Sequence, residues 1–208
     1  MTADNPELIL STNVREHFQH SVTAAMSRQQ VAAEDVTINY LVNLLTEFAH
    51  TDRLFESTDD GVDLKPLAFL YGEALEADHP EVRNRALKRL GDIALFIAGV
   101  FAESLSRKLV DVDYYVAMGG NAYSYLSDVM RGSPFAISRS VVFEELAEKF
   151  VDFVDVVGEA GSASQPTSAA DTLRLYEIWL ATGSKRASRR LAELGIHVAP
   201  FGCKPTRH

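Results

Sequence analysis

The chain is poor in cysteine and has no long apolar run. Its one cysteine, Cys203, cannot close a disulfide within the chain, so nothing indicates an oxidising compartment. The first residues lack the basic and apolar segments of a secretory leader. The longest uncharged apolar run covers residues 93–102, about half of the ~20 residues that span a bilayer. We therefore expect a cytoplasmic protein without a membrane span.

Positive charge is outnumbered by negative charge, since 20 lysines and arginines stand against 29 aspartates and glutamates and the net charge is −9. An acidic body disfavours nucleic-acid binding. Residues 184–208 are the exception, since they hold six basic residues and one acid, which leaves −14 on the first 183. The basic patch consists of Lys185, Arg186, Arg189 and Arg190. It could meet nucleic acid, an acidic partner or anionic lipid, but we favour a solvated face or docking onto the acidic body.

Alternation of apolar and polar residues is absent, whereas helical periodicity runs through most of the chain. We predict an all-α, single-domain bundle of seven or eight helices with a buried central helix and a C-terminal helical hairpin. The expected helices cover residues 13–29, 34–50, 65–77, 78–108, 111–132, 137–158, 168–182 and 184–195. Residues 51–63 are expected to form a loop. The predicted division is a core over 1–158, a linker over 159–167, and a hairpin and tail over 168–208, packed on the core.

The expected helix at 78–108 is apolar on all sides in its second half, which is typical of a helix surrounded by others. Small residues recur along it and would let neighbouring helices approach closely. They are Gly91, Ala94, Ala98, Gly99 and Ala102. Asp92 lies at the edge of this apolar half. It could be a buried acid with a raised pKa, as catalytic acids are, or it could pair with Arg85, Lys88 or Arg89.

Residues 111–128 carry four of the seven tyrosines and the pair Gly119-Gly120. A glycine inside a helix costs about 1 kcal/mol relative to alanine, so two in a row indicate a close approach or a bend. One interpretation is a ligand pocket; its candidate residues are Asp92, Tyr115, Gly119, Gly120 and Tyr123. The other, which we favour, is a tight crossing against the small residues of the helix at 78–108.

A metal site is the weakest of the candidate sites. Glu47 and His50 lie three residues apart on one expected helix, as in the E-x-x-H motifs of di-iron bundles. We find one complete copy of this motif, whereas such centres use two. His17 and His20 form a second spaced pair, but nothing in the spacing brings the two pairs together. The sequence identifies no cofactor, because it contains no nucleophile elbow, CxxC pair or dinucleotide fingerprint.

Residues 90–126 include GDIALFIAGVFAESL and VDVDYYVAMGGNAYSYL. This segment resembles a group of uncharacterised bacterial proteins of similar length. The resemblance implies a bacterial, cytoplasmic protein and carries over no catalytic residues. With abundant amphipathic helix and no catalytic set, we expect a non-enzymatic helical protein that acts by binding, as a homo-oligomer or with a protein partner. The alternative is a small-molecule, cofactor or metal binder, or an enzyme, with a pocket between the helices near 90–105 and 112–130.

Overall fold

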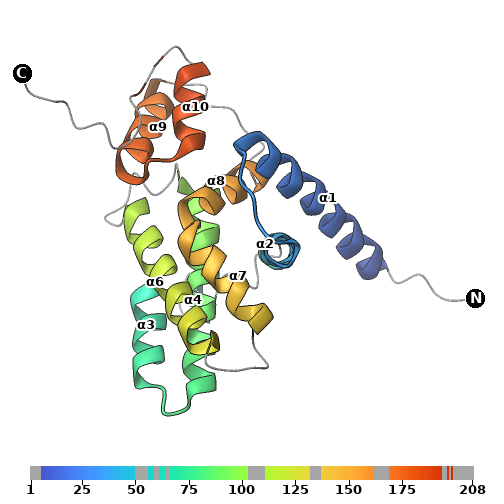
Figure 1. Ribbon diagram of the computed structural model, residues 1–208, viewed down its shortest axis with the longest axis vertical. Coiled ribbons are helices and arrows are strands. Elements are labelled where there is room, and N and C mark those ends of the chain that lie inside the picture. Colours follow the sequence, from blue (N-terminus) through green and yellow to red (C-terminus); the bar gives the residue numbers. More distant parts are fainter. Residues whose placement is uncertain are drawn as a thin grey trace, which may run out of the picture.

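The protein is an all-α bundle, seen here in a computed structural model that describes residues 6–49, 56–58, 61–63, 66–102, 111–131, 137–161, 169–193, 196 and 198 (Figure 1). Within these residues the helices are α1 (Pro6–Gln29), α2 (Asp35–Phe48), α3 (Leu67–Glu76), α4 (Pro80–Val100), α6 (Val112–Arg131), α7 (Ile137–Glu148), α8 (Phe150–Gly161), α9 (Ala169–Thr182) and α10 (Lys185–Glu193). The predicted fold class is confirmed. None of the described helices is long and apolar enough to cross a membrane.

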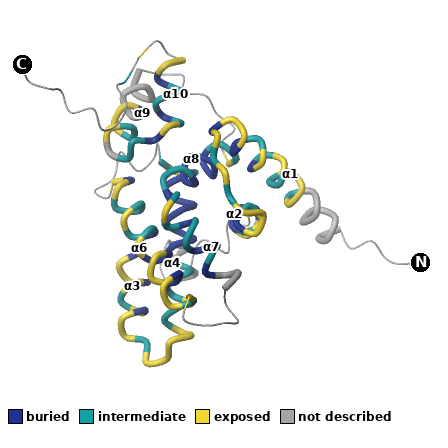
Figure 2. Tube along the Cα trace, viewed as in Figure 1, coloured by how far each residue is buried: buried dark blue, intermediate teal, exposed yellow. Residues whose placement is uncertain are grey.

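Helix α4 is the centre of the bundle, as its apolar second half predicts. Every residue from Leu90 to Gly99 is buried. The helix packs against α3, α6 and α8, and its second half is dark blue in the burial view (Figure 2). A run of ten buried residues cannot face a single neighbour, because successive side chains point around the helix. The all-round apolar pattern therefore follows from the three helices that surround α4.

Two glycines bring α4 and α8 into backbone contact. A Cβ atom on Gly158 would lie 2.6 Å from the Gly99 carbonyl oxygen, and one on Gly99 would lie 2.9 Å from the Val154 carbonyl oxygen. Real Cβ atoms do not approach backbone so closely, so neither position accepts a side chain without moving a helix. The predicted close packing along α4 is thus present at Gly99.

Helix α4 ends earlier than predicted, at Val100 instead of near residue 108. Phe101 leaves helical geometry (φ −109°, ψ 15°), although its N–H still donates to the Ile97 carbonyl at 3.0 Å. The Phe101 ring packs edge-on against Phe96, with ring centroids 5.9 Å apart. Its aromatic contact with the preceding turn holds the residue where the chain departs from the helix. Residues 103–110 lie outside the described part of the chain.

The expected helix at 137–158 is two helices, α7 and α8, which meet at Lys149. One apolar stripe at helical spacing is buried, and it consists of Val142, Leu146, Phe150, Phe153 and Val157. At this junction the lysine ammonium donates to the Ala32 carbonyl and to Glu145, each at 2.8 Å. The backbone N–H groups of Lys149 and Phe153 still donate to the carbonyls of Glu145 and Lys149, each at 2.9 Å. Asp155, an acid of α8, is also buried.

Part of the expected loop at 51–63 forms a small antiparallel ladder. Strands β1 (Glu56–Thr58) and β2 (Gly61–Asp63) pair with Ser57 opposite Val62. The prediction of a loop is therefore wrong for these six residues. With three residues per strand there is no run in which apolar and polar side chains can alternate, so the sequence shows no strand signal.

Helices α9 and α10 form the C-terminal hairpin and have a small core of their own, made by Leu175, Ala187 and Leu191. Gly183 joins them with a φ of 71°, a conformation that glycine adopts without strain. Ser184 then caps α10, since its hydroxyl oxygen accepts the N–H of Ala187 at 3.0 Å, as the sequence predicts. The hairpin contacts α6 and α8. Most of the proposed linker and tail lies outside the described residues, and the domain boundaries stay a prediction.

Helix α1 begins at Pro6, seven residues before the predicted start. A proline suits the first turn of a helix, because the N–H it lacks would have no intrahelical partner there. The other end of α1 is tied to α8: the Gln29 amide donates to Glu159 at 2.7 Å, and Arg28 forms an ion pair with the same carboxylate. The two outer thirds of the chain therefore meet beside the central helix.

Candidate functional site

A buried carboxylate on α4 is the focus of a polar cluster. Asp92 is 8% exposed, and its Oδ1 atom accepts hydrogen bonds from the hydroxyls of Tyr40 at 2.5 Å and Tyr123 at 2.7 Å. Its Oδ2 atom accepts from the Lys88 ammonium at 2.6 Å. Lys88 is one of the three basic residues predicted to pair with Asp92, and the pairing is confirmed. Three donors from α2, α4 and α6 thus converge on one acid.

The cluster strongly disfavours ionisation of its two phenols. Burial raises the pKa of Tyr40 well above its ordinary value of 10.0, and the charge of Asp92 and the hydrogen bond to it raise it further. Burial likewise raises the pKa of Tyr123, followed by the charges of Asp92 and Tyr40. Lys88 lies 5.0 Å above the centre of the Tyr40 ring, within the range of a cation–π contact. The two tyrosines therefore act as donors to a carboxylate.

The Tyr123 ring is held between aromatic neighbours and the backbone of α4 at Gly91, where a side chain is absent. It stacks on Phe143, with centroids 5.7 Å apart, and is tilted against Phe150 at 6.0 Å. A Cβ atom on Gly91 would lie 2.6 Å from Cε1 of this ring. The ring thus lies directly against the backbone of α4, and its hydroxyl reaches Asp92 one residue further along.

An alkaline titration of tyrosine absorbance tests this cluster. Both folded-state pKa values lie above the unfolded value, so these phenols contribute stability that is present below pH 10 and lost as the pH rises toward the folded-state pKa. We expect Tyr40 and Tyr123 to be the last of the seven tyrosines to ionise, together with loss of helical circular dichroism. Removing one late phenol with Tyr123→Phe provides the control. All seven tyrosines ionising while the helices stay intact would contradict the cluster.

Gly119 and Gly120 have different roles, although they are adjacent. A Cβ atom on Gly119 would collide with the Phe150 ring, 2.6 Å from its Cε2 atom, and would lie 2.8 Å from the Ala94 Cβ. A Cβ atom on Gly120 would be 4.0 Å from its nearest neighbours, which is ordinary contact. Gly119 is therefore the point where α6 crosses α4 and α8, and this contact supports the packing interpretation.

Tyr115 and Gly120, the remaining ligand candidates, lie apart from Asp92 and Tyr123. Tyr115 is half-buried beside Tyr114, with ring centroids 5.6 Å apart, and burial followed by that neighbour raises its pKa. Gly120 lines an open groove of about 660 Å³ between α6, the α7–α8 junction and the turn before α10. The structure thus joins two of the five predicted residues, Asp92 and Tyr123, in direct contact.

A second buried carboxylate, Asp155, is not among the site residues predicted from the sequence. It is 4% exposed and accepts the Ser184 hydroxyl at 2.6 Å and the Arg186 backbone N–H at 2.9 Å. Burial raises the pKa of Asp155, while the two hydrogen bonds oppose that effect. The acid therefore stands at the positive end of α10 and joins the C-terminal hairpin to the core.

A pocket of about 240 Å³ lies beside Asp155, under the C-terminal hairpin. It is bounded by the end of α4, the start of α6, and helices α8, α9 and α10. Asp155, Thr182, Ser184 and Arg186 supply its polar side chains, and alanine, valine, leucine and isoleucine side chains supply most of the rest. The predicted pocket lay between α4 and α6 near Gly119 and Tyr123. The observed pocket lies instead where α4 ends and α6 begins.

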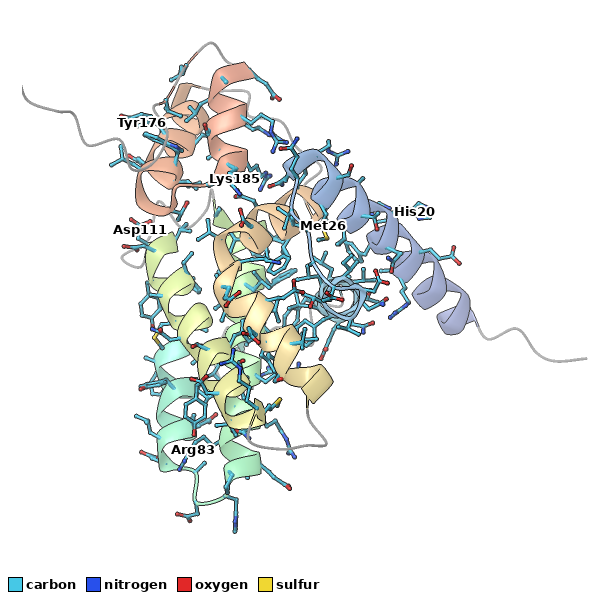
Figure 3. The ribbon with its side chains drawn as sticks, in the orientation of Figure 1. His20, Met26, Arg83, Asp111, Tyr176 and Lys185 are labelled. Carbon is cyan, nitrogen blue, oxygen red and sulfur yellow. The ribbon has the colours of Figure 1, made fainter. Side chains whose placement is uncertain are left out.

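The basic patch partly faces the acids of α8. Lys185 lies at the junction of the hairpin with the core (Figure 3) and pairs with Asp152 at 2.8 Å. The Arg186 guanidinium lies close to Gly158, while its backbone N–H donates to Asp155. Arg189 and Arg190 are half-buried. Two of the four basic residues thus contact the acidic body, as the docking interpretation predicts.

The predicted metal pair stays a prediction, because one of its two residues lies outside the described part of the chain. Glu47 is exposed on α2, and His50 lies outside the described part of the chain. His17 and His20 are exposed on α1, and His20 points away from the body (Figure 3). Within the described ranges, no three histidine, cysteine, aspartate or glutamate residues are grouped so that they could hold a metal ion.

The fold and the buried clusters define a class, an all-α bundle in which two interior carboxylates join helices from distant parts of the chain. The chain matches no family model, no curated protein and no solved structure. The resemblance of residues 90–126 to uncharacterised bacterial proteins therefore stands without an assigned activity.

Proposed function

We propose that this protein is a non-enzymatic helical interaction protein that works as a homo-oligomer, in its simplest form a homodimer. The observation that carries the proposal is an apolar surface on α3 and the neighbouring parts of α4 and α6. Its exposed side chains are Phe69, Tyr71, Leu75, Val82, Tyr125 and Val129. Soluble proteins rarely leave a contiguous apolar surface uncovered unless another molecule binds it.

The pattern of α3 supports this proposal. Leu67, Leu70 and Ala74 are buried toward the body of the protein, while Phe69 and Leu75 are 66% and 63% exposed. A helix that carries large apolar residues outside its core-facing stripe is typical of one covered on more than one side. Within the described residues the body covers one side of α3, so a partner surface accounts for the other.

The chemistry of the interior agrees with a binding role. Asp92 and Asp155, the two buried acids, are engaged by donors from neighbouring helices. Such groups are used to hold helices together, which leaves the outer surface as the place for function. We place this activity in the bacterial cytoplasm, on the resemblance of residues 90–126 and the single cysteine. We propose that nucleic acid is not the partner, because the net charge is −9.

Sedimentation equilibrium of the untagged protein tests the proposal. We expect a mass of twice 22.9 kDa at concentrations of about 10 to 100 µM, where dimers of micromolar affinity are populated. Dilution should restore the 22.9 kDa species in a reversible equilibrium. A single monomeric species across the whole range would overturn the proposal.

Small-molecule binding is a second candidate, and the pocket under the C-terminal hairpin favours it. Its volume of about 240 Å³ is near the lower end of known ligand sites, and its polar side chains gather around Asp155 and Arg186. Native mass spectrometry of freshly purified protein is the test. A bound species released on denaturation would support this candidate, and a spectrum containing the bare chain alone would count against it.

A further inference from the structure

Helix α3 is fixed rigidly on α4, so it presents a defined surface. The Arg83 side chain of α4 donates hydrogen bonds to the carbonyl oxygens of Ala74 at 3.1 Å and Ala77 at 3.0 Å. These carbonyls belong to the last turn of α3 and the residue after it, where helical partners are missing. Arg83 lies at the end of the α3–α4 pair away from the C-terminal hairpin (Figure 3).

The outer face of α3 contains a glycine that the isolated chain does not explain. A Cβ atom on Gly72 would have no heavy atom within 4 Å, in contrast to Gly91, Gly99 and Gly119. Glycine is the poorest helix former after proline, so its presence here weakens the helix without any close contact in return. An approach from outside the chain, by a second helix, supplies the missing contact.

The residues around Gly72 are arranged symmetrically. Phe69 precedes it by three positions and Leu75 follows it by three, so both lie on the same side of the helix as the glycine. If two copies of α3 crossed antiparallel at Gly72, Phe69 of each copy would face Leu75 of the other. This self-complementary pairing is what a two-fold dimer interface requires.

The charges of α3 favour the same antiparallel orientation. The helix has no acidic residue in its first turn and no basic residue in its last turn. Glu76, at its C-terminal end, is exposed and lies at the negative end of its own helix dipole. An antiparallel partner brings the positive end of its α3 next to Glu76. A parallel partner would instead place two acidic ends together.

A groove beside Leu75 is placed to receive the facing phenylalanine. It has a volume of about 360 Å³ between α3, α4 and α6, and Leu75, Tyr71, Met118 and Tyr125 are among its lining residues. Grooves of at least about 300 Å³ hold whole small molecules, so a single phenyl ring fits. An aromatic side chain that fills a partner's groove is the usual form of a dominant interface contact.

We infer that the partner of this surface is a second copy of the chain, docked with its α3 antiparallel and crossing at Gly72, so that Phe69 of each copy enters the groove beside Leu75 of the other. This inference rests on the proposed homodimer. It adds the location and orientation of the interface, which the dimer mass alone does not give.

Two substitutions and a matched control test the location by sedimentation equilibrium. Phe69→Lys should raise the dimer dissociation constant about 100-fold or more, because it removes the central apolar contact. Gly72→Leu should weaken the dimer similarly by blocking the close approach, while the open space around Gly72 lets the variant keep the helical circular dichroism of the wild type. Leu180→Lys on α9 removes a side chain that is 54% exposed on another element and should change the constant by no more than about twofold.

Disulfide formation tests the orientation. In a Cys203→Ser background, a Phe69→Cys chain mixed with a Leu75→Cys chain should form a covalent heterodimer under mild oxidation, because an antiparallel pair places position 69 of one copy opposite position 75 of the other, whereas a parallel pair does not. Thr23→Cys, on the exposed face of α1, should stay monomeric on denaturing gels. A native dimer that survives both Phe69→Lys and Gly72→Leu would overturn the inference and leave the proposed dimer intact. A monomeric wild-type chain would overturn both.

Discussion

Gly119→Leu is expected to lower the free energy of unfolding by about 3 kcal/mol, because its side chain has to displace both Phe150 and Ala94. The Phe150 ring is buried and packs on Tyr123, so displacing it also disturbs that aromatic contact. Overpacking here would push α6 away from α4 and α8 together. Urea denaturation followed by circular dichroism measures the effect.

The neighbouring glycine provides a matched control. Gly119→Ala and Gly120→Ala gain the same helix propensity, about 1 kcal/mol, but they place the new Cβ atom differently relative to Phe150. At Gly120 the added Cβ atom would be in ordinary contact with Phe150 at 4.0 Å, whereas at Gly119 it would clash with the ring. Gly120→Ala should therefore leave stability unchanged or raise it, while Gly119→Ala should lower it. An unchanged unfolding midpoint for Gly119→Leu would remove the packing explanation and return the segment to the candidate pockets.

Asp92→Ala is the second substitution with a large expected effect, a loss of about 3 kcal/mol of unfolding free energy. The change strands the hydroxyls of Tyr40 and Tyr123 away from water, and Tyr123 has no exposed surface. Loss of the ion pair costs less free energy at Lys88, because its side chain is 45% exposed and can turn into solvent. Thermal and urea unfolding together give the size of the loss.

The source of that loss can be isolated by a double-mutant cycle. Adding Tyr123→Phe to Asp92→Ala removes one of the stranded hydroxyls, so the two changes should cost less together than the sum of their separate effects. Asp128→Ala provides the surface control, because that carboxylate is 71% exposed and its pair with Arg131 spans 3.6 Å. Additive effects of the first two changes would mean that Asp92 does not stabilise the protein through the phenols.

Local chemistry is the part of the structure that could be predicted from the residues. Ser184 followed by a helical pattern predicts a cap, because a hydroxyl satisfies a backbone N–H within three residues. Lys88 and Asp92 are four apart on one helix and therefore meet wherever the helix lies. The apolar stripe of α7 and α8 is likewise fixed by helical spacing. These relations depend on near neighbours in the chain.

The features that were missed depend on contacts between distant residues. Lys149 has the local pattern of an ordinary helix residue, and its ammonium contacts Ala32 across 117 positions of sequence. Tyr40 meets Asp92 across 52 positions of sequence. The residues near Asp155 in the sequence do not predict its burial, because its hydrogen-bond partner Ser184 lies 29 positions away. No pattern of neighbouring residues in the sequence predicts these long-range contacts.

The contact between α1 and α8 has a consequence for how the protein is made. Gln29 and Glu159 are 130 residues apart, so a ribosome moving at 5 to 20 residues per second needs about 7 to 26 s to synthesise the second after the first. During that time the apolar face of α1, with Val22, Ala25 and Met26, has no α8 to cover it. Helix α2 can cover part of α1 early, but the side of α1 that contacts α8 stays uncovered until residue 159 is made. This is the interval in which a chaperone would find its binding site.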